Sequence, residues 1–582
     1  MDRQAWIAVT LCVMGLVAWY GYNATHLPPA PLRAIVSPTP AAPESPVTAA
    51  ASQAPSVSPA PEAIPTSSPA PSVPSFAEKT ETLRNADVEL RLTNRGAGIS
   101  EAALLKHTTE NGRAVILNSA DRTPVGAIIE QPGAPALPEF EIVRGDDGSI
   151  QFERKTTDGV NIRKKFFFPP TLEKKDNFVA EMDVDFRNDG AQPYTNAGYF
   201  VAVGSTQPLH PSDMPSYTRL VWCVEGKPKA TDVSWFAAQN YPLVGVQKRA
   251  AQPMFQEKVN GAEWAAMTNQ FFTTIITPLN AKVSEAWAQP FEIKRPDGPS
   301  LQGIDGAMGM PGFQLQPGQT TTLRFQLYVG PKLYNRLAKL EHDEAEIMNF
   351  GMWKLVSQFL LNFMNLIHGW VGDYGWSIII LTACVKGVLW PLQNKANRSM
   401  RKMSALAPKM QELKEKYKDD PTRMNQEVMK LYKEHGVNPV GGCLPMMIQI
   451  PIFFGLFSML GQAAELRNAS FLWVHDLSQP DTIGHLPGLD WKINLLPLLM
   501  GGTNLWLMRM TPKTGDSTQQ RIMMFMPLIF LFFCYNFAAA LALYYTTQNL
   551  FTILQLWQNK RQPVPVLEKV APAGKKSRKG RP

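Results

Sequence analysis

The last third of the chain is dominated by long apolar blocks, and these constrain the fold more than any other feature. The blocks cover residues 376–392, 440–460, 491–508 and 522–557. The last block is long enough for two membrane crossings at about 20 residues each. A further apolar run covers residues 5–22 and ends in aromatic residues, as membrane spans often do. The sequence therefore predicts six spans, an N-terminal anchor and a five-helix core.

The first 75 residues contain two different segments. Residues 1–27 are predicted to be an uncleaved transmembrane signal anchor, because no small-x-small cleavage site follows the apolar run. A cleaved signal peptide is the alternative. Residues 28–75 contain 14 prolines among Ala, Ser and Thr, with few charges. Such a composition cannot form a packed core and predicts an extended linker.

Residues 76–343 show the two-residue periodicity of β-strands. Val88, Leu90 and Leu92 alternate with charged residues, and similar runs follow between Gly, Asp, Asn and Pro breaks. Many strands without helical periodicity predict a large antiparallel β-sandwich. Together with the transmembrane helical bundle, this makes the predicted fold class that of an α+β membrane protein. The region has no metal-ligand spacing, no Gly-rich phosphate loop and no GxSxG motif. We therefore expect a binding or scaffolding domain rather than an enzyme.

The distribution of charge predicts the orientation of the spans. Residues 393–438 carry 11 Lys and Arg against 6 Asp and Glu, and the loop 509–521 and the tail 563–582 are also basic. Cytoplasmic loops are enriched in Lys and Arg, so these segments are predicted to be cytoplasmic. With six spans, both termini are then cytoplasmic, and the β-sandwich lies on the opposite side of the membrane.

Residues 344–370 include an apolar segment that we do not count as a span. Polar or small residues recur in it at steps of three or four and form one stripe on a helix. They are Gly351, Lys354, Gln358, Asn362, Asn365 and Gly369. This pattern predicts an amphipathic helix that lies in the membrane interface. A seventh span would also place the N-terminus and residues 393–438 on opposite sides of the membrane.

The basic segment 393–438 is predicted to be an antiparallel helical hairpin. Apolar residues step by three and four in its first helix, as in a coiled-coil seam. They are Met403, Leu406, Met410, Leu413 and Tyr417. Asp420 and Pro421 then mark the start of a second helix. The apolar seam either packs on itself or binds apolar segments of other proteins. The basic faces of the hairpin suit ribosomal RNA, acidic proteins or anionic lipid.

Residues 371–562 are the predicted core, and Lys386 is the one full charge inside its four apolar blocks apart from Lys492 at a block edge. A charge at this depth is costly, so it faces a wet cavity or a partner, or it snorkels to the inner headgroups. Other polar residues of the blocks would line a hydrophilic groove with it: Thr382, Gln449, Thr503, Asn504, Thr546, Gln548, Asn549 and Gln555. No nucleophile and base, channel ring or inverted repeat accompanies them. We expect a groove without catalytic chemistry, cofactor or metal.

The second apolar block carries a specific resemblance. Residues 438–457, Asn-Pro-Val-Gly-Gly-Cys-Leu-Pro-Met-Met-Ile-Gln-Ile-Pro-Ile-Phe-Phe-Gly-Leu-Phe, resemble the third-span signature of the YidC/Oxa/Alb family of membrane insertases. Shorter matches are residues 524–527 in the fifth span, 543–545 and 549–551 in the sixth, and 329–332 at the end of the β-region. The order of parts also resembles a Gram-negative member of this family, which implies a bacterial inner membrane with the β-sandwich in the periplasm.

The resemblance implies an insertase and chaperone that inserts membrane proteins through an inner-leaflet groove without ATP. Its implied partners are nascent membrane proteins, the Sec translocon, the ribosome and signal recognition particle pathway, and the phospholipid bilayer. Lys386 stands where the family usually has Arg, and Ala538–Ala540 stand where it has Pro-x-Gly. Two alternatives stay open: a translocon-associated scaffold or chaperone without insertion activity, and a transporter with a periplasmic sugar-binding domain.

Overall fold

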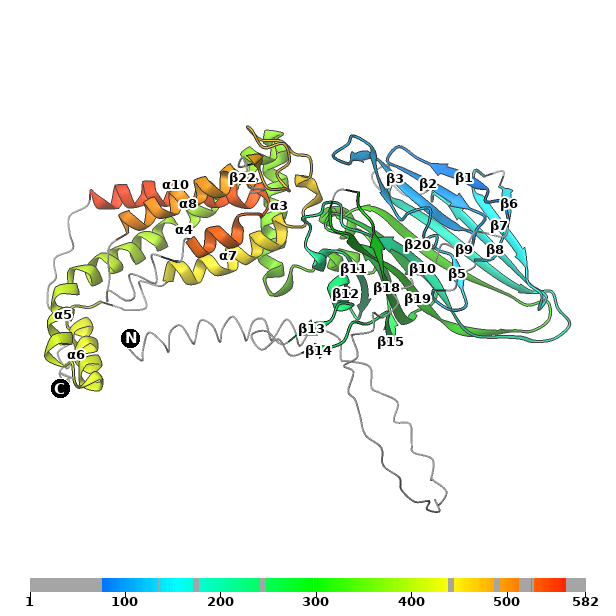
Figure 1. Ribbon diagram of the computed structural model, residues 1–582, viewed down its shortest axis with the longest axis horizontal. Coiled ribbons are helices and arrows are strands. Elements are labelled where there is room, and N and C mark those ends of the chain that lie inside the picture. Colours follow the sequence, from blue (N-terminus) through cyan, green and yellow to red (C-terminus); the bar gives the residue numbers. More distant parts are fainter. Residues whose placement is uncertain are drawn as a thin grey trace, which may run out of the picture. The chain divides into compact units, whose positions relative to one another are not determined.

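The computed structural model describes most of the chain from residue 76 to residue 561 (Figure 1). The described residues are 76–133, 137–145, 147–170, 177–240, 247–296, 298–437, 444–485, 492–511, 525 and 528–561. The predicted anchor, linker and basic tail lie outside them. The chain divides between Gly330 and Pro331 into a strand-rich unit and a unit made mostly of helices. The predicted α+β fold class is confirmed.

The strand-rich unit contains three large sheets built from antiparallel pairs. The nine-stranded sheet has the order β12 (Lys227–Asp232), β11 (Arg219–Val224), β16 (Trp264–Thr268), β17 (Phe272–Pro278), β20 (Thr320–Pro331), β9 (Val179–Asn188), β8 (Val160–Phe167), β7 (Ile150–Lys155) and β6 (Glu141–Arg144). The five-stranded sheet has the order β15 (Phe255–Ala262), β18 (Val283–Ile293), β19 (Leu301–Leu315), β10 (Tyr194–Thr206) and β5 (Ile128–Ile129). The four-stranded sheet consists of β1 (Thr80–Arg84), β2 (Val88–Thr93), β3 (Gly98–Thr108) and β4 (Ala114–Leu117), and β13 (Gln239–Asn240) pairs with β14 (Gln247–Arg249).

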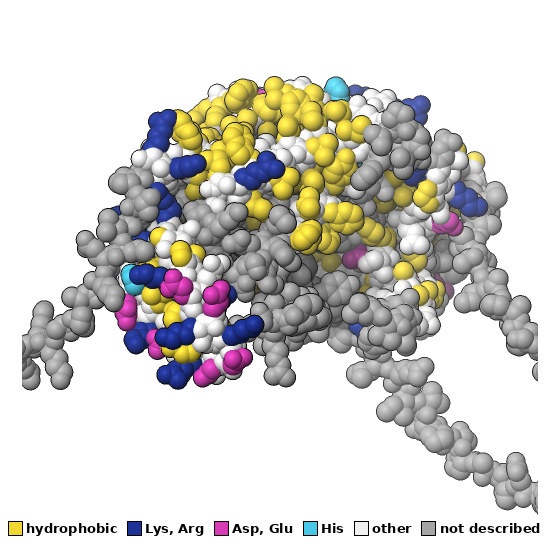
Figure 2. All heavy atoms as spheres, turned by 60° about the vertical axis from the view of Figure 1, so that its left-hand side comes forward, with side chains coloured by type: hydrophobic (Ala, Val, Ile, Leu, Met, Phe, Trp, Pro, Cys, Tyr) yellow, Lys and Arg dark blue, Asp and Glu magenta, His cyan; other side chains and the backbone are white. Residues whose placement is uncertain are grey.

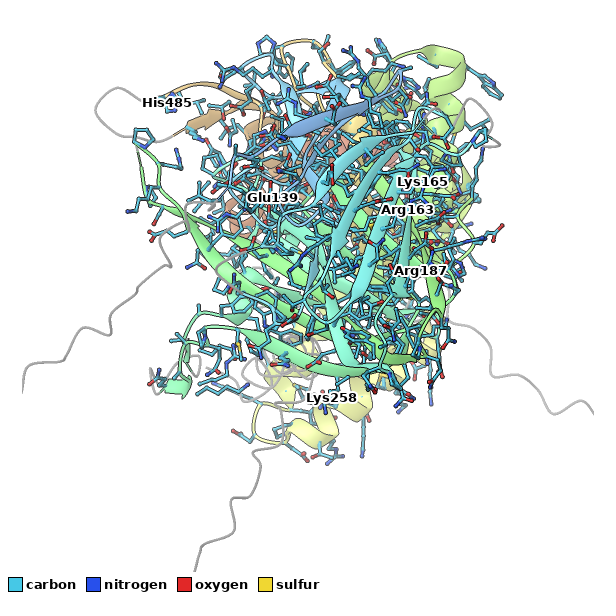
Figure 3. All side chains as sticks on the ribbon, turned by 90° about the vertical axis from the view of Figure 1, so that its right-hand side faces the viewer. Glu139, Arg163, Lys165, Arg187, Lys258 and His485 are labelled. Carbon is cyan, nitrogen blue, oxygen red and sulfur yellow. The ribbon has the colours of Figure 1, made fainter. Side chains whose placement is uncertain are left out.

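Alternation along the strands gives the sandwich its apolar interior. Phe166 in β8 and Val184 in β9 are buried, whereas Arg163 and Lys165 of β8 lie on the outer face (Figure 3). The five-stranded sheet packs on the nine-stranded one, with β19 crossing β11 and β16. Gly306 in β19 permits this approach, because a Cβ there would lie 2.3 Å from the sulfur of Met267. The observed packing is the face-to-face arrangement of a β-sandwich.

One inward position of the sandwich carries a lysine. Lys164 in β8 is fully buried, and its ammonium donates to the carbonyl oxygens of Ala97 and Gly126, the latter at 2.5 Å. A third carbonyl, that of Gly96, lies at 3.4 Å. Lys164 therefore joins β8 to the β2–β3 turn and to the loop before β5. Burial lowers the pKa of Lys164 to about 7.

The helical unit places several helices side by side (Figure 1). The helices are α2 (Tyr334–Leu337), α3 (Lys354–Val371), α4 (Tyr374–Ala405), α5 (Ala407–Lys416), α6 (Pro421–Glu434), α7 (Leu444–Leu460), α8 (Leu495–Met510) and α10 (Ala539–Lys560). Residues 528–534 are also helical, and a turn separates them from α10. α10 packs against α8 and α4, and α3 packs against α4 and α7. Within the described part of the chain, α4 alone is long and apolar enough to pass a length-and-composition test for a membrane span.

The predicted interfacial helix is shorter than expected. Residues 344–353 form two 3₁₀ turns, Glu344–Met348 and Gly351–Trp353, and α3 begins only at Lys354. The prediction of a helix from residue 344 was wrong because Asn349 and Gly351 adopt left-handed backbone conformations, with φ of 40° and 61°. Such conformations end a helical turn.

α3 presents two different apolar faces. Leu360, Leu361, Met364 and Ile367 are buried against neighbouring helices, whereas a second set is exposed. The exposed set is Leu355, Phe359, Leu366 and Trp370. A helix that packs on one side, exposes apolar side chains on another and keeps polar residues between them suits a membrane interface.

α4 continues past the expected start of the hairpin at residue 393. It runs through Pro391 to Ala405, and the helix breaks at Leu406, where Pro408 stands in the first turn of α5. α5 and α6 then form the predicted antiparallel hairpin, and the Asp420 carboxylate caps α6 by accepting from the amide of Arg423 at 3.0 Å. Proline fits the first turn of a helix, where amide hydrogens have no partner, so Pro408 and Pro421 both mark helix starts.

The hairpin seam contains only part of the predicted residue set. Leu406 is buried with Tyr432 and Val437, and the apolar side chains packed against them are Met403, Met410, Val428 and Leu431. Leu413 and Tyr417 lie outside this cluster. The prediction failed for Tyr417 because the chain turns there, and Lys416 and Arg423 lie 5.6 Å and 5.5 Å from its ring centroid.

Candidate functional site

Lys386 links α4 to α10 by a hydrogen bond, and a neighbouring pair of glutamines links α10 to α7. The Lys386 side chain is only 4% exposed, and Nζ donates to Oγ1 of Thr552 on α10 at 2.8 Å. The Thr552 hydroxyl donates to the backbone carbonyl of Gln548 at 2.8 Å. Gln449 on α7 donates from Nε2 to Oε1 of Gln548 at 3.0 Å. We call Lys386, Gln449, Gln548 and Thr552 the Lys386 cluster.

The Lys386 cluster lies deep within the bundle. Lys386 follows Trp376, in the first turn of α4, by a helical rise of about 15 Å. The hydrocarbon core of a bilayer is about 30 Å thick, so this is near mid-depth when Trp376 lies at one interface. No ion pair to Lys386 is found among the described residues. The cluster therefore holds a cation with hydroxyl and amide neighbours but no counter-charge from the described chain.

A second polar pair faces a different helix. Asn549 is buried and donates from Nδ2 to Oγ1 of Thr503 at 3.1 Å and to the carbonyl of Met500 at 3.5 Å, both on α8. Adjacent residues of a helix point about 100° apart. Gln548 and Asn549 therefore serve separate contacts, and the predicted groove residues do not form one continuous group.

The remaining predicted groove residues have no hydrogen bond to the Lys386 cluster among the described contacts. The Thr382 hydroxyl bonds to the carbonyl of Ile378 in its own helix at 2.6 Å. Oγ1 of Thr546 is buried without a hydrogen-bond partner among the described residues. Asn504 is half-buried on α8. Thr382 thus acts within α4, as a threonine in an apolar helix usually does.

A polar seam continues from the cluster along α4 and α10. Gln555 donates to Oδ1 of Asn394 at 2.8 Å and to the carbonyl of Trp390 at 3.2 Å. Asn559 donates to the same Asn394 oxygen at 2.9 Å, and Arg401 donates to the carbonyl of Asn559 at 2.8 Å. Among these residues, sequence reasoning named only Gln555.

A pattern that would reveal this seam is present in the sequence. Gln548, Thr552, Gln555 and Asn559 follow one another at steps of four, three and four, so they share one face of α10. A polar stripe on an otherwise apolar membrane helix indicates a helix–helix contact or a wet surface.

A small cavity lies between α4 and α7, on the same side of α4 as Lys386. It is lined by Leu389, Leu392 and Gln393 of α4 and by Ile448 of α7. The side-chain oxygen of Gln393 is buried without a donor among the described residues. The space between these two helices is therefore incompletely filled near the Lys386 cluster.

The segment that connects α7 to α8 covers the first turns of α8 and α10, at the end of the bundle away from the α5–α6 hairpin. The α10 amides of Ala539 and Ala540 donate to the carbonyls of Gln479 at 2.8 Å and Leu477 at 2.9 Å. An amide in the first turn of α8, that of Leu496, donates to the Asp481 carboxylate at 2.6 Å. Leu477 is fully buried beneath the segment. We call residues 461–485 with 492–494 the outer connector.

Replacing Gly375 with alanine is expected to loosen the outer connector from α4. A Cβ at Gly375 would lie 2.1 Å from the Phe471 ring, so the ring must move and lose its packing. Overpacking of this kind costs about 1–3 kcal/mol. Thermal unfolding of the purified protein in detergent measures the loss. Gly369→Ala is the matched control, because nothing lies within 4 Å of its added Cβ; equal unfolding temperatures for the two variants would contradict the expectation.

The described residues contain no group of three or more His, Cys, Asp and Glu side chains that could hold a metal ion. What the bundle offers instead is a buried cation, amide and hydroxyl groups, and a surface of exposed apolar side chains over the helices (Figure 2). This combination can bind a polar segment and contact lipid at the same time.

Comparison with known proteins assigns both units. Residues 81–363 match the family model "YidC periplasmic domain", and residues 366–564 match the model "60Kd inner membrane protein". The membrane protein insertase YidC of Chlorobaculum parvum is 30% identical over 595 residues, covering 95% of this chain and 94% of that protein. The chain belongs to the YidC family of membrane protein insertases.

The YidC of Pelobacter propionicus is similar over the same extent, with 29% identity across 96% of this chain and 99% of that protein. A crystal structure of an active YidC insertase with its first transmembrane domain resolved covers 84% of this chain at 17% identity and a TM-score of 0.35. The two family models and the two insertase relatives confirm the resemblance predicted from residues 438–457. As a YidC family member, the chain is an inner membrane insertase whose β-sandwich is the periplasmic domain.

Proposed function

We propose that this YidC family insertase receives the polar segment of a client protein at the Lys386 cluster. The observation that supports this is a buried cation without an ion-pair partner among the described residues. A charge inside a membrane bundle costs at least about 2.5–3.5 kcal/mol, so its retention calls for a compensating interaction. A carboxylate from an entering client supplies one, while the hydroxyl and amide groups of Thr552, Gln548 and Gln449 replace water around the client backbone.

The proposed topology has six spans with both termini in the cytoplasm. The basic hairpin α5–α6, over which charged side chains gather in Figure 2, is then cytoplasmic, and the outer connector faces the periplasm. In this orientation, the start of α4 lies at the periplasmic side and Lys386 lies about 15 Å deeper. The small cavity beside Gln393 lies in the cytoplasmic half of the α4–α7 contact in this orientation.

Insertion in this scheme needs neither ATP nor a metal. Transfer of the client's apolar helix from the groove into lipid releases free energy, because about 20 apolar residues leave water. The cation lowers the cost of bringing polar residues across. The Thr552 hydroxyl accepts from Lys386 and donates to the carbonyl of Gln548, so the lysine does not act as its base, and the proposed role is electrostatic rather than catalytic.

The hairpin is proposed to meet the targeting machinery. Its exposed basic residues suit ribosomal RNA or acidic proteins, and the ribosome, the signal recognition particle pathway and the Sec translocon are the proposed partners. A translocon-associated chaperone without its own insertion activity would use the same surfaces.

Reconstitution of the purified chain in liposomes tests the proposed function. A short client with one acidic residue in its translocated segment is synthesised in the presence of these vesicles, without a translocon and without ATP regeneration during the insertion step. Protease protection of the translocated segment is expected only in vesicles that contain the chain. Protection that appears only when the translocon is added would favour the chaperone alternative.

A further inference from the structure

The outer connector carries an exposed apolar turn. The amide of Phe471 donates to the carbonyl of Val474 at 2.8 Å, and the amide of Val474 donates back at 2.9 Å. Leu472 and Trp473 therefore form the two-residue tip of a tight turn. Leu472 is 73% exposed and Trp473 is 37% exposed, although turn tips in water are usually polar.

The backbone of this tip is strained for a leucine. Leu472 has φ of 53°, in the left-handed region, where a residue with a Cβ is disfavoured by about 1–2 kcal/mol. Glycine or asparagine would adopt this conformation at lower cost. The Leu472 side chain gains almost no burial within the described chain, so neither conformation nor packing accounts for a leucine here. A contact outside the described chain would account for it.

The turn is fixed rigidly to the helices beneath it. Phe471 is 6% exposed, packs on Gly375 and makes an edge-to-face contact with Trp376, whose ring centroid lies 5.7 Å away. The indole of Trp473 donates to Asp481 at 3.1 Å, and the same carboxylate oxygen accepts the Leu496 amide at the start of α8. The tip is therefore held between the first turns of α4 and α8.

We propose that Leu472 and Trp473 insert into the interfacial layer of the periplasmic leaflet. The occupant of this surface is lipid, because the tip is continuous with Trp376 at the start of α4, which is 52% exposed. Tryptophan with its apolar ring and polar N–H prefers the level of the lipid headgroups. The inference rests on the proposed topology, in which the start of α4 lies at the periplasmic side.

This contact fixes the depth of the insertase in the bilayer. The outer connector also holds the first turns of α8 and α10, so a tip anchored at the interface fixes three helix ends at one level. Lys386 is then held about 15 Å below the interface rather than drifting toward either surface. Burial of the Leu472 side chain in the bilayer offsets the free-energy cost of its left-handed backbone conformation, which contacts within the described chain do not offset.

The test uses the full chain in liposomes of phosphatidylethanolamine and phosphatidylglycerol. The five natural cysteines are replaced, and Leu472→Cys carries an environment-sensitive fluorophore. His475→Cys is the matched control, because His475 is an exposed polar residue of the same connector. Quenching by a lipid with a nitroxide near its headgroup is compared with quenching by aqueous iodide added outside vesicles in which the β-domain faces outward.

The fluorophore at residue 472 is expected to emit at shorter wavelength, to be quenched by the nitroxide lipid and to be shielded from iodide, with the reverse at residue 475. Iodide quenching at both residues would overturn the proposal. Shielding from iodide without nitroxide quenching would also overturn it, since a protein would then cover the turn. Client insertion is measured on the same vesicles, so lipid quenching without insertion would count against the proposed function and leave the lipid contact standing.

Discussion

Replacing Lys386 with methionine is expected to lower the initial rate of insertion about tenfold or more for a client with an acidic translocated segment. Methionine keeps the length and apolar stem of the side chain but removes the charge. A hydrogen bond to a charged group contributes about 1.5–3 kcal/mol, and 1.4 kcal/mol corresponds to a tenfold change. Lys386→Glu is expected to have a larger effect because it repels the client carboxylate. Lys386→Arg is expected to retain most activity. Insertion into liposomes, normalised to the amount of reconstituted protein, measures each effect.

Two matched variants separate charge from packing. Thr552→Val removes the hydroxyl that accepts the Lys386 hydrogen bond but leaves the cation in place, so a small loss is expected. Thr382→Val is expected to be nearly silent, because its hydroxyl bonds within its own helix. A client whose acidic residue is changed to the amide is expected to be insensitive to Lys386→Met. Equal loss of insertion for acidic and amide clients would rule out an electrostatic role.

Much of the architecture follows from patterns that are visible in the sequence. The two-residue alternation at Val88, Leu90 and Leu92 appears in the structure as β2, and the apolar run that contains Lys386 appears as α4. Helix ends were less predictable. Periodicity extends the interfacial helix back to residue 344, whereas the left-handed conformations of Asn349 and Gly351 delay α3 to Lys354. Backbone conformations of this kind depend on tertiary packing as well as on residue type.

Lys386 could be singled out as a candidate from the sequence, but most of its contacts could not be predicted. Lys386 stood out because an unpaired charge in an apolar block has few explanations. Its hydrogen-bond partner Thr552 was missed, since a threonine in an apolar helix usually bonds to its own backbone. Gln548 and Asn549 are neighbours in sequence, yet one faces α7 and the other faces α8. The sequence identifies the polar residues of a helical bundle. Which of them contact one another depends on how each helix is oriented about its own axis.

The free energy of unfolding of the β-sandwich is expected to rise with pH between about 7 and 10.5 through Lys164. Its pKa is about 7 in the folded protein, because burial disfavours the charged form, against the ordinary 10.5. Between these values the unfolded chain binds more protons than the folded one, so folding is favoured as pH rises. Below pH 7 both states are protonated and this gain is absent. The shift corresponds to a gain of about 5 kcal/mol at most.

Lys164→Met isolates this contribution because methionine has a similar length and does not titrate. At pH 10 the neutral amine of the wild type still donates hydrogen bonds to the carbonyls of Ala97 and Gly126, so the variant is expected to be less stable by about 2 kcal/mol. At pH 6 the buried ammonium costs more than those bonds return, and the variant is expected to be the more stable protein. Urea unfolding of residues 76–331 at several pH values measures both differences.

Lys165→Met is the matched control, because it removes a neighbouring lysine that is not buried in the sandwich. Its stability difference from the wild type is expected not to change sign between pH 6 and pH 10. Lys165 lies on the opposite face of β8, with Nζ 2.6 Å from Asp147, and is labelled on the outer surface in Figure 3. A stability difference between wild type and Lys164→Met that stays constant from pH 6 to pH 10 would show that Lys164 keeps its ordinary ionisation. In that case the three carbonyl oxygens around Lys164 would have to stabilise its ammonium to the same extent as hydration does in water. The β2–β3 turn would then be held by a charged lysine throughout this pH range.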